Sequence, residues 1–590
     1  MKYSSMTLDK MTNSTIGLIT TKNATNFKLH SRTRRHKQYV TSETEISCFH
    51  PMGLNLDADE NCNFVRQNYY CNFNTKLINY LEFAVCTMRI DNYPWYGEIG
   101  YIICSFLLLL FLVFTFFIMT RWFIIPNLLT LLNWCSLKSY QYGVIIVSIL
   151  MILPNLFMSS IICNAPKESY STLITELSSK TFTMYGFGMA LIAVNKNVYT
   201  SPLRCVVDLS VILLGNIYIF LLIHFKTKSD NLPKDEQFDL KLGLHAKLLI
   251  VAYSVYLFAQ LYDPFKKFMG KSKRVANVMA APEEIEGEIV IEDVLEEVAA
   301  YVSANDNPSV LKENFRPLYG DIFGKKFIVL NILCAPIWFV LTLLIPVINE
   351  NLPFQGWHKY LLCVNLFFIS LPLFGYIQMK ICFIFIAIGF LLSLVLVFAT
   401  NAAEPPSYYK IFSIFGLFTA FMIYHLIVME IDTIIQQCLQ YAAGWNIDAV
   451  TVISSSFSNG FTEIMLIHEI IKCGEEDIAF GLVIGLVVYN TLGGFPVMLL
   501  QPCFDTSSIM FLTNSNSTLH VFLFMLIAYN FFALVISNFE LRRSYGVFLF
   551  IFCCIFFLFI ILIACECIHS YGSQHSPIAL YETTAHANWS

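Results

Sequence analysis

Long apolar runs separated by short polar stretches recur along the whole chain. A helix of about 20 apolar residues crosses a hydrocarbon core that is about 30 Å thick. The pattern therefore predicts an all-α polytopic membrane protein with about 12–13 transmembrane helices. The predicted spans lie near 98–120, 142–163, 181–195, 204–225, 244–262, 326–349, 357–376, 379–400, 409–432, 447–471, 478–500, 518–537 and 545–568.

The composition agrees with a membrane protein and excludes other classes. Of the 590 residues, 56% are hydrophobic and 13% are charged, about half the charged fraction of a soluble domain. The net charge of −5 gives no indication of a nucleic-acid partner. The sequence contains no nucleophile elbow, phosphate-binding loop or His/Cys spacing of a metal site. We expect a transporter and no enzyme, with no cofactor, whose partners are the transported cations and the lipid bilayer.

Polar segments divide the spans into groups. Five basic residues between 266 and 274 follow the fifth span directly, so the positive-inside tendency places the next loop on the cytosol-like side and the N-terminus opposite. The predicted parts are a non-cytosolic cysteine-containing region at 1–95, a first membrane domain at 96–262, a central regulatory loop at 263–325, additional membrane helices at 326–408, a second membrane domain at 409–570 and a tail at 571–590.

The N-terminal region carries signs of an oxidising compartment. It contains an even number of cysteines, Cys48, Cys62, Cys71 and Cys86. Two sequons begin at 13 and 23, which is consistent with a glycoprotein. We expect two disulfides on the non-cytosolic side. The alternative is four unpaired thiols and two chance sequons.

The second half contains an unusually polar run inside an apolar helix. Ser455, Ser456, Asn459 and Glu463 have the spacing of one helix face. Gly460 permits a local unwinding that would expose backbone carbonyls to an ion. An intramembrane carboxylate in such company indicates an ion pathway. The alternative is a protonated Glu463 that forms a hydrogen bond between helices.

A weaker signal lies in the span 142–163 of the first half. Pro154 interrupts the helix, and Asn155 presents an amide oxygen beside the interruption. Proline kinks also serve packing alone, which is the alternative here. If the two halves are inverted copies, the helices near 150 and 460 point in opposite directions. Thirteen full spans would leave them parallel, so either one of the three segments between 326 and 400 is incomplete or one pair of spans is miscounted.

The two segments, with several scattered anchors, carry a family resemblance. The anchors are 458–463 (SNGFTE) with Ala479-Phe480, Gly485 and Tyr489-Asn490; 150–157 (LMILPNLF) with Gly186 and Gly188; and the N-terminal patterns Cys62-x3-Arg66-x4-Cys71 and Tyr80-Leu81-Glu82-x3-Cys86. The chain resembles the sodium/calcium exchangers of the cation/calcium antiporter superfamily, closest to the mitochondrial sodium/calcium/lithium exchanger branch, over most of its length. The alpha repeats would lie at about 142–195 and 447–500.

The resemblance implies an inverted-repeat core that exchanges Ca²⁺ for Na⁺ or Li⁺ and contributes to calcium homeostasis. It implies Pro154 and Gly460 as helix breakers. The implied cation ligands are Glu463, Asn459, Asn155, Asn490, Ser455 and Ser456. The mitochondrial inner membrane and the plasma membrane both remain open as locations.

The departures from the family pattern weaken the implied site. The first repeat holds Asn155 and Met151 where the family has an Asp and an Asn, and the second replaces its Asp by Glu463. One carboxylate is a poor ligand set for a divalent ion, unless Glu430 or Asp432 reaches the site. The alternative function is a transport-silent or monovalent-selective paralogue, acting as a homo-oligomer or as the regulatory partner of an active exchanger.

Overall fold

In the computed structural model, both halves of the chain are built from helices. The structure describes only part of the chain. The described residues are 58–67, 78–90, 94–135, 137–154, 169–195, 198–199, 202–230, 241–279, 328–350, 357–369, 371–372, 379–401, 405–443, 445, 447–500, 514–565 and 567–569.

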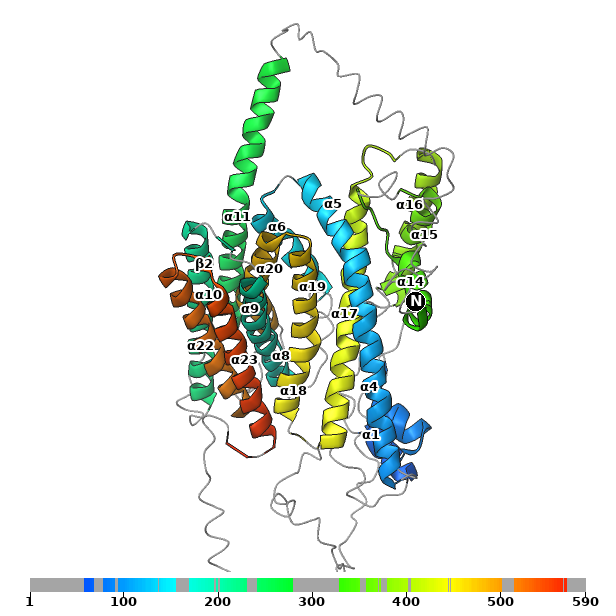
Figure 1. The fold of residues 1–590 in the computed structure, drawn as a ribbon, viewed down its shortest axis with the longest axis vertical. Coiled ribbons are helices and arrows are strands. Elements are labelled where there is room, and N and C mark those ends of the chain that lie inside the picture. Colours follow the sequence, from blue (N-terminus) through cyan, green and yellow to red (C-terminus); the bar gives the residue numbers. More distant parts are fainter. Residues whose placement is uncertain are drawn as a thin grey trace, which may run out of the picture. The chain divides into compact units, whose positions relative to one another are not determined.

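The first half contains a short N-terminal cap and five long helices (Figure 1). The N-terminal elements are α1 (Ala58–Gln67), α3 (Tyr80–Glu82) and η3 (Phe83–Thr87). The long helices are α4 (Pro94–Met119) continued by η5 (Thr120–Ile124) and α5 (Ile125–Cys135); α6 (Ser139–Tyr142) with η6 (Gly143–Val147), helical to Pro154; α8 (Ser169–Thr183) with η7 (Met184–Gly188) and α9 (Met189–Asn195); α10 (Pro202–Asp230); and α11 (Leu242–Met279).

The second half is also built from helices. They are α14 (Ile328–Leu344), α15 (Lys359–Phe368), α16 (Met379–Ala399), α17 (Ile411–Cys438) with η12 (Leu439–Ala443), α18 (Ile447–Ser455) with η13 (Ser456–Gly460) and α19 (Phe461–Lys472), α20 (Glu476–Tyr489) with η14 (Asn490–Gly494) and α21 (Phe495–Leu499), α22 (Asn514–Ile536) and α23 (Arg543–Ala564). A two-residue strand from each half, β1 (Val198–Tyr199) and β2 (Glu540–Leu541), form an antiparallel pair.

Seven helices in the described residues are long and apolar enough to cross a membrane, and four shorter apolar helices accompany them. Many large apolar side chains on them are exposed, among them Phe398, Ile536 and Leu203. Such surface is stable in lipid and unfavourable in water. The prediction of an all-α polytopic membrane protein is confirmed, while the total of about 12–13 transmembrane helices stays a prediction.

Three boundaries differ from those predicted. The third span, expected at 181–195, begins at Ser169, because polar residues of α8 such as Thr175, Ser178 and Ser179 are buried against other parts of the protein and do not end the helix. The residues after 262, expected to be loop, continue α11 as helix to Met279, because a helix satisfies its own backbone groups outside lipid as well. α15, within the span predicted at 357–376, has 10 residues, about 15 Å, which is too short to cross a bilayer.

The core includes two pairs of consecutive helices. The first helix pair comprises Ser139–Pro154 and α8–α9, and the second comprises α18–α19 and α20–α21. Each of these four helices contains one five-residue π-helical turn, η6, η7, η13 or η14. Such turns are rare and occur frequently at functional sites.

The two pairs contact each other in a crossed-over order. Helix Ser139–Pro154 packs on α20: a Cβ on Gly143 would lie 2.9 Å from Leu482 N, and one on Gly485 would lie 3.0 Å from the Ser148 Cβ. The other contact joins α8 to α18 and η13, where Ser179 meets Val452 and Ser456. Thus the first helix of each pair packs on the second helix of the other.

The contacts also give the directions of the helices. Residue numbers rise together along both contacts, so each contacting pair is parallel. Figure 1 shows the chain rising both from α8 to α9 and from α18 to α19. A tight turn around Gly474, with φ of +83°, reverses the chain between α19 and α20. The helices at 139–154 and 447–472 are therefore antiparallel, which is the relation expected of inverted repeats.

Candidate functional site

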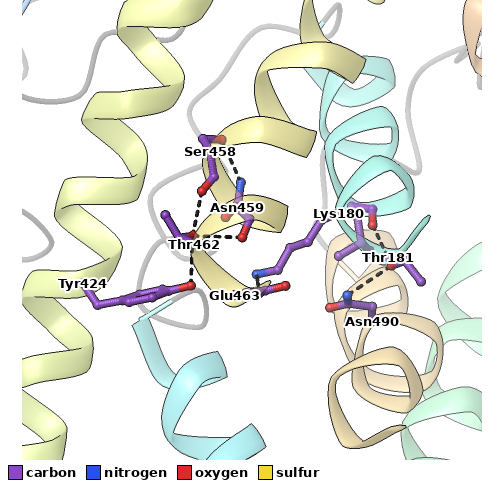
Figure 2. A network of polar contacts seen from close by, with 9 residues as sticks. Lys180, Thr181, Tyr424, Ser458, Asn459, Thr462, Glu463 and Asn490 are labelled. Carbon is purple, nitrogen blue, oxygen red and sulfur yellow. Dashed lines mark hydrogen bonds and ion pairs between the residues drawn. The ribbon is translucent and has the colours of Figure 1, made fainter. Parts of the chain in front are cut away.

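A buried ion pair connects the two helix pairs. The Lys180 ammonium on α8 lies 2.9 Å from Oε1 of Glu463 on α19 (Figure 2). The side chains are 11% and 1% exposed, respectively. The second oxygen of Glu463, Oε2, is buried and has no hydrogen-bond partner among the described residues. The negative charge of Glu463 is therefore balanced by Lys180, while its Oε2 is still able to accept a hydrogen bond or bind a cation.

Lys180 was not predicted from the sequence. It is the only charged residue between 177 and 195, and it lies just before the predicted third span. That span was too short to cross a bilayer, and its extension toward the N-terminus would have included Lys180. A charged residue inside a membrane helix usually faces the bundle interior and pairs with another charge. The length of the span was thus the signal that could have identified it.

Three consecutive residues of α8 contact three parts of the second helix pair. Ser179 donates to the Val452 carbonyl at 2.7 Å, and its Oγ lies 2.5 Å from that of Ser456. Lys180 binds Glu463. Thr181 accepts a hydrogen bond from the Asn490 side chain at 3.1 Å. The predicted residues Ser456, Glu463 and Asn490 thus meet on one segment of the first helix pair.

The π-helical turn η13 is held from the opposite side by α17. Asp432 Oδ1 accepts a hydrogen bond from Ser458 at 3.0 Å, and its Oδ2 accepts one from Gln436 at 2.8 Å. Tyr424 OH lies 3.1 Å from Thr462 Oγ1, which also donates to the Asn459 carbonyl at 2.9 Å. Of the two additional acids considered, Asp432 therefore reaches the turn that contains Asn459.

Ser455 and Asn459 are both buried on the same helix as Glu463. The Ser455 hydroxyl has no hydrogen-bond partner among the described residues. The Asn459 amide is 3.4 Å from the Ser458 hydroxyl, a long contact. The Ser455 hydroxyl is therefore unused in the described part of the chain, while the Asn459 amide makes only a long contact within its own turn.

Gly460 does not break the helix as expected. Its φ of −63° and ψ of −47° are helical, and the chain passes through η13 into α19 without interruption. A Cβ at this position would lie 2.7 Å from the Thr183 Cβ. The absence of a side chain therefore lets α8 approach, and the irregularity of the helix is a π turn instead of a break. Pro154 is the last described residue of its helix.

Asn490 lines a small cavity of about 40 Å³ whose wall is mostly apolar. The cavity also contains Asn216, Thr491 and His520, and Asn216 donates to Thr491 at 3.0 Å. The buried Nε2 of His520 has no hydrogen-bond partner among the described residues. A cavity of this size with these polar groups has room for about one to three waters.

Glu430 turns away toward the N-terminal cap. Its carboxylate accepts a hydrogen bond from Tyr80 at 2.6 Å. Gln437, on the same helix, accepts from the Leu81 backbone N–H at 3.0 Å. Within the cap, Cys62 and Cys86 form a disulfide. Glu430 is thus engaged by residues of the segment that the disulfide closes.

A second buried carboxylate, Asp208 on α10, serves as a contrast. Gln260 on α11 donates to its Oδ1 at 2.7 Å, and Tyr140 on α6 donates to its Oδ2. Both oxygens are used by protein donors, so this carboxylate joins three helices. Glu463 differs because one of its oxygens is unused.

Several predicted residues lie outside the description. They are Asn155, Cys48, Cys71 and the two sequons at 13 and 23. Among the residues that are described, no group of three or more His, Cys, Asp or Glu could hold a metal ion. The carboxylate, amide and hydroxyl oxygens around Glu463 are instead of the type that binds alkali and alkaline-earth cations.

No protein-family model matches the chain, and no curated protein matches it. The structure is similar to that of the sodium-calcium exchanger NCX_Mj in the presence of Na⁺ and Sr²⁺, with 13% identity and a TM-score of 0.38 over 78% of this chain and 97% of the other. At these values the similarity assigns neither a fold nor a function to this chain.

Proposed function

We propose that this protein is a secondary active antiporter that moves cations across the membrane in which it lies. The observation that carries the proposal is Glu463, a buried carboxylate with an unused oxygen at the contact between two inverted helix pairs. Intramembrane carboxylates that face the bundle interior mark ion pathways, and inverted repeats place such sites between them. Ser455, Asn459 and Asp432 supply further oxygens on or against the same helix.

The charge of the site supports monovalent cations over Ca²⁺. Glu463 is already neutralised by Lys180, and a divalent ion would add two uncompensated charges to a buried site. Exchange of Ca²⁺ for Na⁺ or Li⁺, which the family resemblance implies, would need a second carboxylate such as Asp432. We therefore expect Na⁺ or Li⁺ to be a transported ion, with Ca²⁺ a weaker substrate.

The same ion pair supports a second candidate function. A lysine that holds the site carboxylate permanently would leave a transport-silent protein, which could act as a regulatory partner of an active exchanger. The two candidates differ in one measurable property, because a silent protein shows no ion flux under any gradient.

The test is ion flux in proteoliposomes that contain the purified full-length protein. Uptake of ²²Na⁺ and ⁴⁵Ca²⁺ is measured against outward Na⁺, Li⁺ and H⁺ gradients. Glu469→Gln is a matched control, since Glu469 is a buried carboxylate on the same helix and pairs with Lys472 at 2.9 Å. We expect Glu463→Gln to abolish the flux and Glu469→Gln to retain it. Absence of flux from the wild type in every gradient would favour the silent partner.

A further inference from the structure

We propose that Lys180 is a built-in cation of the site, which competes with the transported cation for Glu463. In this inference, which rests on the proposed antiport function, the ammonium occupies the carboxylate when no ion is bound. An entering cation displaces it, and the ammonium returns when the ion leaves. Lys180 would then determine the affinity of the site for a cation.

The position of Lys180 supports competition. Its ammonium lies 2.9 Å from Oε1 of Glu463, so an ion bound to both carboxylate oxygens would overlap it. Like charges this close in a buried site repel strongly. A cation can therefore use Glu463 fully only after the ammonium has moved away.

The protein offers the displaced ammonium a second position. Glu176 lies four residues before Lys180 on α8, and this spacing allows a Glu and a Lys on one helix to interact. A lysine side chain has a flexible four-carbon stem, so its ammonium can exchange one carboxylate for another by rotation. Glu176 is only partly buried, so an ammonium that reaches it is less enclosed by protein than one on Glu463, which is 1% exposed.

The net charge at Glu463 then favours a monovalent cation over a divalent one. Glu463 and Lys180 together are neutral, and a monovalent cation that replaces the ammonium leaves the carboxylate neutralised. A divalent cation that replaces it leaves one net positive charge, which is unfavourable in a buried site. The unused oxygens of Glu463 and Ser455 are available as ligands once the ammonium has left.

The first experiment measures equilibrium binding of ²²Na⁺ and ⁴⁵Ca²⁺ to purified full-length variants by scintillation proximity. Lys180→Met removes the charge and keeps the length, and we expect Na⁺ affinity to rise at least about tenfold, with measurable Ca²⁺ binding. Lys180→Arg keeps the charge and should bind no more tightly than the wild type. Glu176→Gln removes the second position, and we expect its Na⁺ affinity to fall several-fold.

The second experiment needs no variant. Reductive methylation of the wild-type protein, read by mass spectrometry, reports how accessible each lysine is. We expect saturating Na⁺ to increase labelling of Lys180 several-fold relative to choline at equal ionic strength. Lys472 is the matched control, because it forms an ion pair with Glu469 in the same helix and should show no change.

The outcomes separate this inference from the proposed function. If Lys180→Met and the wild type bind Na⁺ equally and Na⁺ leaves Lys180 labelling unchanged, Lys180 is no competitor, although antiport through Glu463 can still hold. If neither the wild type nor Lys180→Met binds Na⁺, Li⁺ or Ca²⁺, the site is not a cation site and both proposals are wrong. If Lys180→Met does not fold, the labelling of wild-type Lys180 decides alone.

Discussion

Gly460 of η13 faces Thr183 of α8 so closely that a methyl group on the glycine would lie 2.7 Å from the Thr183 Cβ. The contact joins the first helix pair to the second one residue after Asn459 and three residues before Glu463. Ser179 and Lys180, one turn earlier on α8, form their hydrogen bond and ion pair across the same interface. The distance between the two helices is therefore fixed by a residue without a side chain, close to the site itself.

We predict that Gly460→Ala destabilises the protein, because the added methyl group forces α8 and α19 apart. Overpacking of this kind costs about 1–3 kcal/mol. Gly243→Ala in α11 is the control, because nothing lies within 4 Å of a Cβ at that position. The thermal unfolding temperature in detergent is the measurement. Equal temperatures for the two variants would contradict the close contact.

The Lys180–Glu463 pair predicts strong coupling in a double-mutant cycle. Lys180→Gln or Glu463→Gln alone leaves a buried charge without its partner, which destabilises by about 3–5 kcal/mol. The double variant Lys180→Gln/Glu463→Gln has no unpaired charge and should unfold at a higher temperature than either single variant. Additive effects of the two substitutions would show that the side chains do not interact.

The N-terminal cap should depend on Tyr80. Burial and its hydrogen bond to Glu430 raise the pKa of the Tyr80 phenol above its ordinary value, so it remains a donor throughout the physiological pH range. Tyr80→Phe removes the donor, and we expect a loss of about 1–3 kcal/mol and faster hydrogen exchange at 79–90. Tyr262→Phe, at an exposed tyrosine, should leave exchange of the same segment unchanged.

Asp208 should matter for stability and not for ion binding. Tyr140→Phe removes one hydrogen bond to this buried carboxylate, which costs about 1–3 kcal/mol. We expect a lower unfolding temperature in detergent with unchanged ²²Na⁺ affinity. A change in Na⁺ affinity larger than the change seen for Glu463→Gln would move the ion site from Glu463 to Asp208.

Local sequence reasoning was sufficient for one side of the site. Glu463 and Asn459 stand out because polar residues are unfavourable in an apolar helix, and both are buried in the structure. To recognise them as polar residues in a membrane helix, only the residues that surround them in the sequence are needed. The helical membrane architecture follows from the length of the apolar runs for the same reason.

The other side of the site required information from distant parts of the chain. Lys180 interrupts a hydropathy pattern, so the predicted span began just after it, at residue 181, and its partner lies in the other half of the sequence. The role of Gly460 could not be read from helix propensity, because it depends on Thr183 from another helix. A residue that weakens an isolated helix here permits two helices to meet.

The crossed-over contacts between the helix pairs bear on how the protein is synthesised and assembled. Helix Ser139–Pro154 is matched to α20 by Gly143 and Gly485, and α8 is matched to α18 and η13. Each of these two close contacts therefore joins one helix from the first half of the chain to one from the second half. When the first half leaves the ribosome, the helix Ser139–Pro154 still lacks α20, and α8 still lacks α18 and η13. Lys180 at that stage has no Glu463 to pair with. Maturation of the first half in the membrane must consequently wait for the second, and two halves produced as separate chains would have to associate before either is complete.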